Sequence, residues 1–242
     1  MHRIGVFDSG IGGLTVLRQL RRAFPQLDMV YLGDTARVPY GGRSVETITH
    51  YAEDDVRFLL RKDVEAIVIA CGTVSSNSLD TLREKFDLPI YGVIGTQATI
   101  KSGAYETHIR AADPAVRVIS RACPLFVPLV ENGIAPDDIV AETVCSRYME
   151  AFDGENIDAL IMGCTHYPVY RPALEKRLPG VRMIDVGEAL AEALRPLFAG
   201  CGGGGAVEYY VTERSAAFDE IVRVMDPTLD PAAIRVENAF IQ

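Results

Sequence analysis

The stretch Ile67–Ser76 reads "IVIACGTVSS", an apolar and β-branched run that stops at Cys71 and continues into a helical pattern. A second stretch, Ala159–Pro168, reads "ALIMGCTHYP" and repeats that order up to Cys164. A short apolar run before a turn and a helix is typical of a buried strand in a parallel sheet. Ligands of parallel α/β sheets lie outside the carboxyl ends of the strands, so both cysteines are predicted at a ligand-binding edge.

The rest of the chain alternates β-branched runs with amphipathic stretches, which predicts an α/β fold of parallel sheets covered by helices. The segment Leu14–Phe24 repeats apolar residues at helical spacing and predicts a helix with one face on the sheet. The run Gly202–Gly205 is either a flexible connector or a tight surface turn. The predicted strands are Arg3–Phe7, Met29–Leu32, Ala66–Ala70, Ile90–Ile94, Val116–Ser120, Leu160–Met162, Arg182–Asp185 and Glu208–Val211.

Length and composition exclude several classes of protein. The 242 residues accommodate one large domain or two modest ones, and without a signal-like first segment or a long apolar stretch we expect a cytoplasmic protein. Five scattered cysteines predict free thiols rather than a disulfide framework. The formal charge of −9 disfavours nucleic acid or an anionic membrane surface as partner, although backbone donors can hold a small anionic ligand.

The segment "DSGIGG" at Asp8–Gly13 suggests a nucleotide-binding loop, but Thr15 stands where the third glycine of the dinucleotide motif belongs. A plainer interpretation is a tight turn into the following helix, whose free N–H groups can hold a carboxylate. Asp8 and Ser9 then face the same cleft, unless either one only caps the helix.

A single cysteine at a strand end is more often a small core residue than a reactive one. Two cysteines in the same context reverse that preference, because each precedes a helix start that stabilises a thiolate and lowers the pKa of the thiol. We therefore predict acid–base roles for Cys71 and Cys164. The other three cysteines lack this context and are predicted to be structural: Cys123, Cys145 and Cys201.

Other chemistries fit the pattern less well. A zinc site is disfavoured, because Cys164 and His166 are two apart and no second pair of close ligands occurs. Pyridoxal phosphate is disfavoured, since none of the four lysines lies at a predicted strand end. Two thiols facing one ligand then indicate proton transfer at carbon from opposite faces. His166 is either a core histidine or a polar partner of Cys164, and Tyr40–Gly41 either shape a proline turn or contact the ligand.

The chain carries, in this order, "GVFDSGIGGLTVL", "YLGDTARVPYGGRS", "IACGTVSS", "GTQATIKSGAYE", "ACPLFVPLVE" and "MGCTHYP". Together these segments resemble the aspartate/glutamate racemase family, and within it the glutamate racemases, from Ile4 to about Val211. The resemblance implies a cofactor-independent isomerase that supplies D-glutamate for peptidoglycan. His166 stands where aspartate racemases carry a glutamate, which favours glutamate as the substrate.

The resemblance also implies roles for single residues. Cys71 would face the α-carbon of D-glutamate and Cys164 that of L-glutamate, as the two acid–base thiols. Asp8 and His166 would assist the neighbouring cysteines, and Glu131 matches a family position near the second thiol. No metal is implied. The substrate-binding positions of the family fall on Asp8, Ser9, Tyr40, Gly41, Gly72, Thr73, Thr165 and His166.

The family resemblance further implies two similar α/β domains that face each other across an active-site cleft. We predict a first domain of residues 1–92 plus 187–242 and a second domain of residues 93–186. The C-terminal segment returns to complete the first domain. A homodimer is the candidate assembly.

Two departures from the family pattern stand out. Gly72 replaces an asparagine common in relatives, which removes a side-chain amide from the predicted site. Between Ile94 and Gly95 the chain lacks about one strand–helix unit, so we expect a shortened second domain that opens more readily around residues 93–125. The rival hypotheses are therefore a catalytically impaired ligand-binding or interaction protein and an aspartate racemase.

Overall fold

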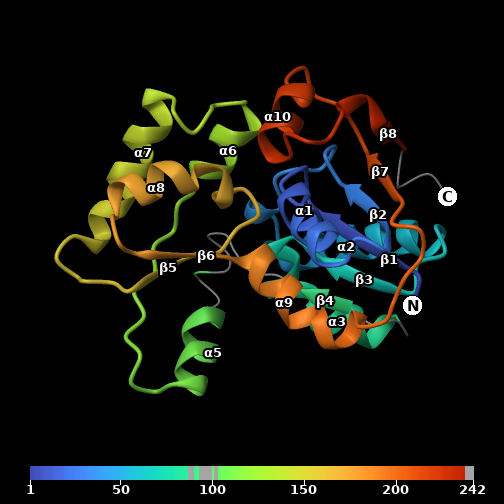
Figure 1. Cartoon of the computed structure of the whole chain (residues 1–242), viewed down its shortest axis with the longest axis horizontal. Helices are drawn as coiled ribbons and strands as arrows, with labels where there is room; N and C mark the ends of the chain where they lie inside the picture. Colours follow the sequence, from blue (N-terminus) through green and yellow to red (C-terminus); the bar gives the residue numbers. More distant parts are fainter. Residues whose placement is uncertain (87–89, 93–99, 101–102, 238–242) are drawn as a thin grey trace.

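The computed structural model describes residues 1–86, 90–92, 100 and 103–237, and its strands form two parallel sheets in two lobes (Figure 1). The strands are β1 (Arg3–Asp8), β2 (Asp28–Gly33), β3 (Ala66–Ile69), β4 (Ile90–Gly92), β5 (Ala159–Met162), β6 (Arg182–Asp185), β7 (Val207–Val211) and β8 (Ile234–Val236). The larger sheet has the order β4-β3-β1-β2-β7-β8, and the smaller sheet pairs β5 with β6. The predicted α/β fold with parallel sheets is confirmed.

Helices cover these sheets and connect their strands. The α-helices are α1 (Leu14–Ala23), α2 (Val45–Leu60), α3 (Gly72–Lys85), α5 (Ala104–Ala112), α6 (Phe126–Glu131), α7 (Ile139–Met149), α8 (Arg171–Arg177), α9 (Val186–Phe198) and α10 (Phe218–Met225). The 3-10 helices are η1 (Tyr40–Gly42), η2 (Glu150–Phe152), η3 (Tyr167–Tyr170) and η4 (Pro231–Ala233). Helices α1, α9 and α10 pack on one face of the larger sheet, and α2 and α3 on the other.

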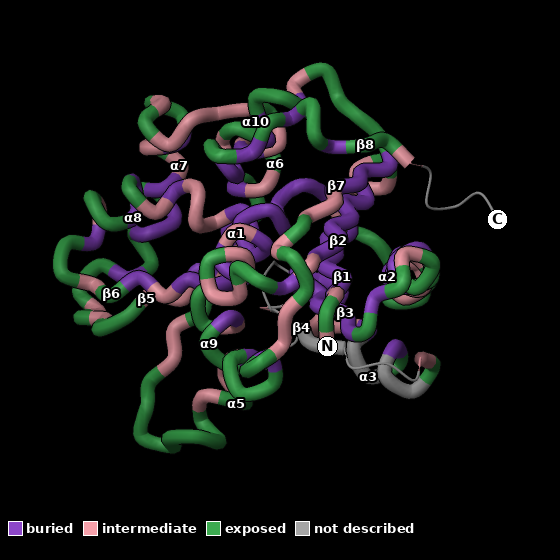
Figure 2. The backbone as a smooth tube through the Cα atoms, turned by 45° about the vertical axis from the view of Figure 1, so that its right-hand side comes forward, coloured by how far each residue is buried: buried purple, intermediate pink, exposed green. Residues whose placement is uncertain are grey.

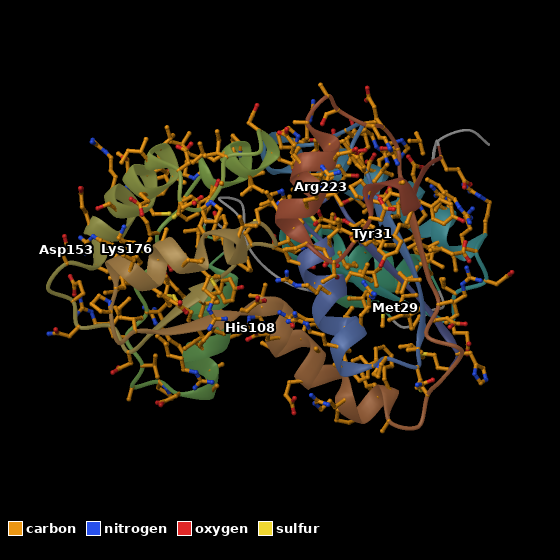
Figure 3. All side chains as sticks on the ribbon, turned by 45° about the horizontal axis from the view of Figure 1, so that its top comes forward. Met29, Tyr31, His108, Asp153, Lys176 and Arg223 are labelled. Carbon is orange, nitrogen blue, oxygen red and sulfur yellow. The ribbon has the colours of Figure 1, made fainter. Side chains whose placement is uncertain are left out.

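Alternation along the strands explains the two cores of the larger sheet. Ile4 and Val6 of β1 belong to the core under α1, whereas Phe7 belongs to the core under α2. Successive side chains of a strand point to opposite faces, so a continuous apolar run can fill both cores. The predicted helix after β1 buries Leu14 and Leu17 against the sheet, as its spacing requires. In contrast to these buried apolar side chains, Lys176 lies at the outer edge of the other lobe (Figure 3).

Seven of the eight predicted strands are confirmed as β1 to β7, with small shifts at their ends. The predicted strand Ile90–Ile94 is observed as Ile90–Gly92, and its last two residues lie outside the described residues. The sequence did not predict β8, a short strand at the edge of the larger sheet.

The predicted strand at Val116–Ser120 is wrong, because this segment is irregular in the structure. A cavity of about 860 Å³ separates it from β5 and is lined by Val118, Leu160 and Ile161. In the described part of the chain β5 pairs with β6 alone, and the cavity separates the segment 116–120 from the other edge of β5, so the two do not form backbone hydrogen bonds.

The glycine run Gly202–Gly205 is an irregular segment held against the residues around the start of β2, so it is neither a free connector nor a tight turn. The Gly203 N–H donates to the carbonyl oxygen of Gln26 at 2.6 Å, and the Gly204 N–H donates to Asp28 Oδ1 at 2.8 Å. Gly205 has a φ of +74°, a left-handed conformation that favours glycine. These contacts hold the start of β7 beside β2.

The division into residues 1–92 plus 187–242 and residues 93–186 stays a prediction, although the two sheets fall on either side of it. Figure 2 shows the strands of the larger sheet as mostly buried and α5 as largely exposed. Within the described ranges, no helix is both long and apolar enough to cross a membrane.

We expect amide hydrogens of β5 and β6 to exchange about a hundredfold faster than those of β1 and β2. Ala159 at the start of β5 is exposed, and the β5 edge that faces the cavity has less apolar cover than the six-stranded sheet. Hydrogen exchange followed by mass spectrometry measures the difference. Equal protection of both sheets would contradict a weakened second lobe.

Candidate active site

Cys71 lies at the carboxyl end of β3 and is the residue before the first turn of α3. Its sulfur is 3.3 Å from Ser9 Oγ, which follows β1, the neighbouring strand of the sheet. Parallel strands end at the same edge, and this explains how residues 62 positions apart come into contact. The predicted place of Cys71 at a strand exit and helix start is confirmed.

The expected lowering of the Cys71 pKa is wrong for this closed site. Burial raises the pKa of the thiol to about 12, and the negative charge of Asp8 adds to that effect. Hydrogen bonds from Ser9 and from the α3 backbone oppose the shift without reversing it. Desolvation of a fully buried thiolate outweighs the favourable helix terminus. Cys71 is therefore a protonated thiol in this state.

Cys164 follows β5 by two residues and precedes η3, so a second strand exit carries the second thiol. Its side chain is buried, and its sulfur lies 3.9 Å from His166 Nδ1. The Oγ of Thr165 lies 3.3 Å from the same nitrogen. Cys164, Thr165 and His166 thus form one cluster, as their spacing in the sequence predicted.

The other ring nitrogen of His166, Nε2, forms a 2.6 Å hydrogen bond and ion pair with Glu131 Oε1 at the end of α6. Burial acts to lower the pKa of His166, but hydrogen bonds to Cys164 and Glu131 together with their charges raise it well above its ordinary value. The raised pKa favours the imidazolium form of the ring, in which both nitrogens are donors. A cation beside a thiol stabilises negative charge on the sulfur.

The glycine loop after β1 joins the two clusters. A Cβ built on Gly12 would lie 2.3 Å from His166 Cε1 and 2.6 Å from Thr165 Oγ1, so only glycine lets the loop approach this closely. Thr15 Oγ1 donates to the carbonyl oxygen of Thr165 at 2.7 Å and ties α1 to the second cluster. The two thiol environments therefore border one shared site.

Asp8 lies at the end of β1 and is fully buried in this site. It accepts a hydrogen bond from the Gly10 N–H at 3.1 Å. Burial raises its pKa, while the positive charge of His166 acts in the opposite direction. Asp8 is thus close enough to both clusters to influence the proton balance of each.

The structure places the remaining predicted substrate residues at the same edge of the larger sheet. Thr73 is buried in the first turn of α3, and Gly41 lies exposed in η1. The Tyr40 hydroxyl contacts the carboxyl groups of Asp34 and Asp55, so the part of Tyr40–Gly41 that can recognise a ligand is the main chain.

Gly72 is the buried first residue of α3, and its φ is not positive, so its backbone conformation does not require glycine. We expect Gly72→Asn to fold normally, to retain turnover, and to lower the KM by up to about tenfold, the effect of one added hydrogen bond. Steady-state kinetics beside a circular dichroism spectrum measure both quantities. A large loss of kcat in a folded variant would mean that the glycine meets a need of the backbone at this position.

The sequence did not single out the residues that hold the loop between β2 and α2. Asp34, Arg37 and Asp55 converge on Tyr40 there, and Thr212 reaches the same cluster from the end of β7. A signal for one of them was present, because Asp55 stands on the stripe of α2 that buries Ile48, Ala52, Val56 and Leu59.

Known proteins resemble this chain over most of its length. The Asp/Glu/Hydantoin racemase family matches residues 91–194. The chain is 43% identical to a glutamate racemase of Aquifex aeolicus, with 92% of this chain and 93% of that protein aligned. It is 46% identical to a glutamate racemase of Thermus thermophilus over 78% of this chain and 77% of that one.

Solved structures of glutamate racemases superpose on most of this chain. The Thermus thermophilus enzyme in complex with β-chloro-D-alanine superposes with a TM-score of 0.84 at 39% identity, covering 98% of this chain and 97% of that chain. The Francisella tularensis enzyme in complex with D-glutamate gives a TM-score of 0.87 at 33% identity, covering 99% and 98%.

Proposed function

The chain belongs to the glutamate racemases and is an amino-acid racemase, and from this premise we propose that it interconverts L- and D-glutamate with Cys71 and Cys164 as acid and base. The observation that supports this proposal most directly is the pair of buried thiols at two strand exits, each beside its own polar partner. Ser9 accompanies Cys71, and His166 accompanies Cys164.

The charges of the site suit reaction from L-glutamate to D-glutamate. In this proposal Cys164, whose sulfur lies 3.9 Å from His166 Nδ1, is the base that removes the α-proton and becomes a thiol. Cys71, a protonated thiol in the closed site, donates its proton to the opposite face of the α-carbon and becomes the thiolate. One C–H bond breaks and one forms, so the substrate inverts without any change in oxidation state.

The reverse reaction begins with the opposite proton distribution. A thiolate at Cys71 removes the α-proton of D-glutamate, and the Cys164 thiol returns a proton to the other face. Asp8, whose own pKa is raised by burial, is placed to exchange a proton with Cys71 between turnovers. Because one cysteine accepts the α-proton and the other donates its replacement, the proposal needs no cofactor and no metal.

The two carboxylates of the substrate meet backbone donors and hydroxyl groups. The loop that leads into α1 and the first turn of α3 bring helix N-termini, which favour anionic groups, to the site. Ser9, Thr73 and Thr165 add hydroxyl groups, and the main chain of Tyr40–Gly41 closes the binding site in this proposal. Gly72 contributes its N–H alone.

A chiral assay with L-glutamate and L-aspartate tests the proposed function. We expect inversion of glutamate and little of aspartate, with activity retained after treatment with a chelator. Faster inversion of aspartate would establish the aspartate racemase instead. Binding of glutamate by calorimetry without inversion of either amino acid would establish the silent ligand-binding relative.

We propose further that the product D-glutamate serves peptidoglycan synthesis in the cytoplasm, since the family resemblance of the chain implies that role. A homodimer is part of the same proposal. Growth of a cell-wall mutant that depends on added D-glutamate, rescued by this chain, tests the first point. Sedimentation velocity tests the second.

A further inference from the structure

The loop between β2 and α2 is anchored by a buried phenol. The Tyr40 side chain is 1% exposed and its hydroxyl group donates to Asp34 Oδ2. The hydroxyl oxygen of Tyr40 also lies 3.1 Å from Oδ2 of Asp55, a fully buried residue of α2. Two carboxyl groups therefore contact one hydroxyl group.

The number of hydrogens decides how these contacts can form. A phenol has one hydrogen and can donate to one acceptor. Its contact with the second carboxyl group is a hydrogen bond only if that group carries a proton and donates to the phenolic oxygen. Without a proton, the two buried carboxylates of Asp34 and Asp55 would share the guanidinium of Arg37. The third carboxylate at this guanidinium, Asp54, also pairs with Arg57 at 3.2 Å.

The distribution of donors assigns the proton. Both oxygens of Asp34 accept hydrogen bonds, Oδ2 from Tyr40 and Arg37, and Oδ1 from Thr212 at 3.1 Å. Neither oxygen of Asp34 is therefore suited to hold a proton. Asp55 Oδ1 accepts from Arg37 at 3.3 Å, which leaves Oδ2, the atom beside the phenol, as the site of the hydrogen.

We infer that Asp55 is a positioning residue, kept as a neutral acid that donates to Tyr40, and that the chain Asp55–Tyr40–Asp34 fixes the loop that holds the substrate. The last part rests on the proposed function, because Tyr40–Gly41 is the substrate-binding part of that loop. The anchoring itself does not depend on turnover.

The charges around Asp55 support this assignment. Burial raises the pKa of Asp55 well above its ordinary value, and the negative charge of Asp34 raises it further, while Arg37 acts in the opposite direction. The titratable groups that face Asp55 are Asp34, Arg37 and Tyr40 of the loop and Asp54 of α2. Since the folded-state pKa is raised, the neutral acid survives to a higher pH than in an ordinary aspartate, and the anchor weakens as the pH rises through the raised value.

Infrared spectroscopy of the whole chain reads the proton without any catalysis. A neutral carboxylic acid has a C=O stretch that is separate from carboxylate and amide bands. We expect wild type to show such a band at neutral pH and Asp55→Asn to lose it. Because burial also raises the pKa of Asp8 and of Asp34, the difference between the two spectra is the relevant signal. Asp54→Asn is the matched control and retains the band, since Asp54 contacts Arg37 and is partly exposed.

Kinetics then test the positioning role. The side-chain amide introduced by Asp55→Asn donates to the phenol as the acid does, so the KM of this variant stays near the wild-type value and loses its dependence on alkaline pH. Asp55→Ala leaves the phenol and Arg37 without this partner and raises the KM about tenfold or more, with a small change in kcat. A spectrum unchanged in Asp55→Asn would overturn the assignment of the proton. An unchanged KM in folded Asp55→Ala would overturn the positioning role, and absence of any racemase activity in wild type would instead contradict the proposed function.

Discussion

Replacing either active-site cysteine by serine is expected to lower racemisation of glutamate by at least about a thousandfold. Inversion requires a base on one face of the α-carbon and an acid on the other, and Cys71→Ser or Cys164→Ser removes one of the two. A serine hydroxyl group is too weakly acidic to replace a thiol or a thiolate at neutral pH. Circular dichroism detection of the α-carbon configuration measures the loss.

The surviving thiol gives each variant a distinct residual reaction. Cys164→Ser retains the base that faces D-glutamate and should exchange its α-hydrogen with solvent without inversion. Cys71→Ser should do the same with L-glutamate. Cys201→Ser is the matched control, because Cys201 is partly exposed on the larger lobe and should leave activity unchanged. Racemisation near the wild-type rate in either active-site variant would reject the assignment of the two thiols.

The second large effect is expected at His166. We expect His166→Gln to lower kcat/KM by about a hundredfold, because glutamine keeps one hydrogen bond but removes the positive charge beside Cys164. The loss should be equal in both directions, since enantiomers have equal free energy and their equilibrium constant is one. Kinetics from each enantiomer measure both values.

Glu131→Gln separates the charge of this pair from its hydrogen bond. The variant keeps a partner for His166 Nε2 but removes the negative charge that helps to raise the pKa of His166. The pKa of His166 falls, the imidazolium is lost at a lower pH, and the alkaline limb of the rate profile moves to lower pH. An unshifted alkaline limb in Glu131→Gln, or full activity in His166→Gln, would contradict the role given to the imidazolium.

Much of the fold could be predicted, because the sheet strands are apolar runs whose carboxyl ends carry the chemistry. Cys71 and Cys164 were placed correctly at strand ends for this reason. Helix α3 follows Cys71, and the 3-10 helix η3 follows Cys164. The segment Val116–Ser120 has the same local character, but the cavity separates it from β5 and the two do not pair. Strand formation depends on a partner that the local sequence does not reveal.

The sequence predicted which residues form the site more readily than it predicted their protonation states. The pKa of Cys71 depends on how completely the folded chain excludes water, and burial reverses the effect expected of the helix terminus. Tyr40 was expected as a ligand contact, yet its hydroxyl group serves Asp34 and Asp55. Such contacts join residues of different elements, and only the tertiary structure brings them together.

The central claim is that two thiols act on opposite faces of one carbon, and the isotope content of the product tests it most directly. Racemisation of L-glutamate in D2O should give D-glutamate that carries deuterium at the α-carbon from the first turnovers, because the Cys71 thiol returns a solvent-derived hydrogen. The L-glutamate that remains should stay mostly unlabelled early in the reaction, and the converse should hold from D-glutamate. Unlabelled product would contradict the account, since it would mean that a single base carries the same proton from one face to the other.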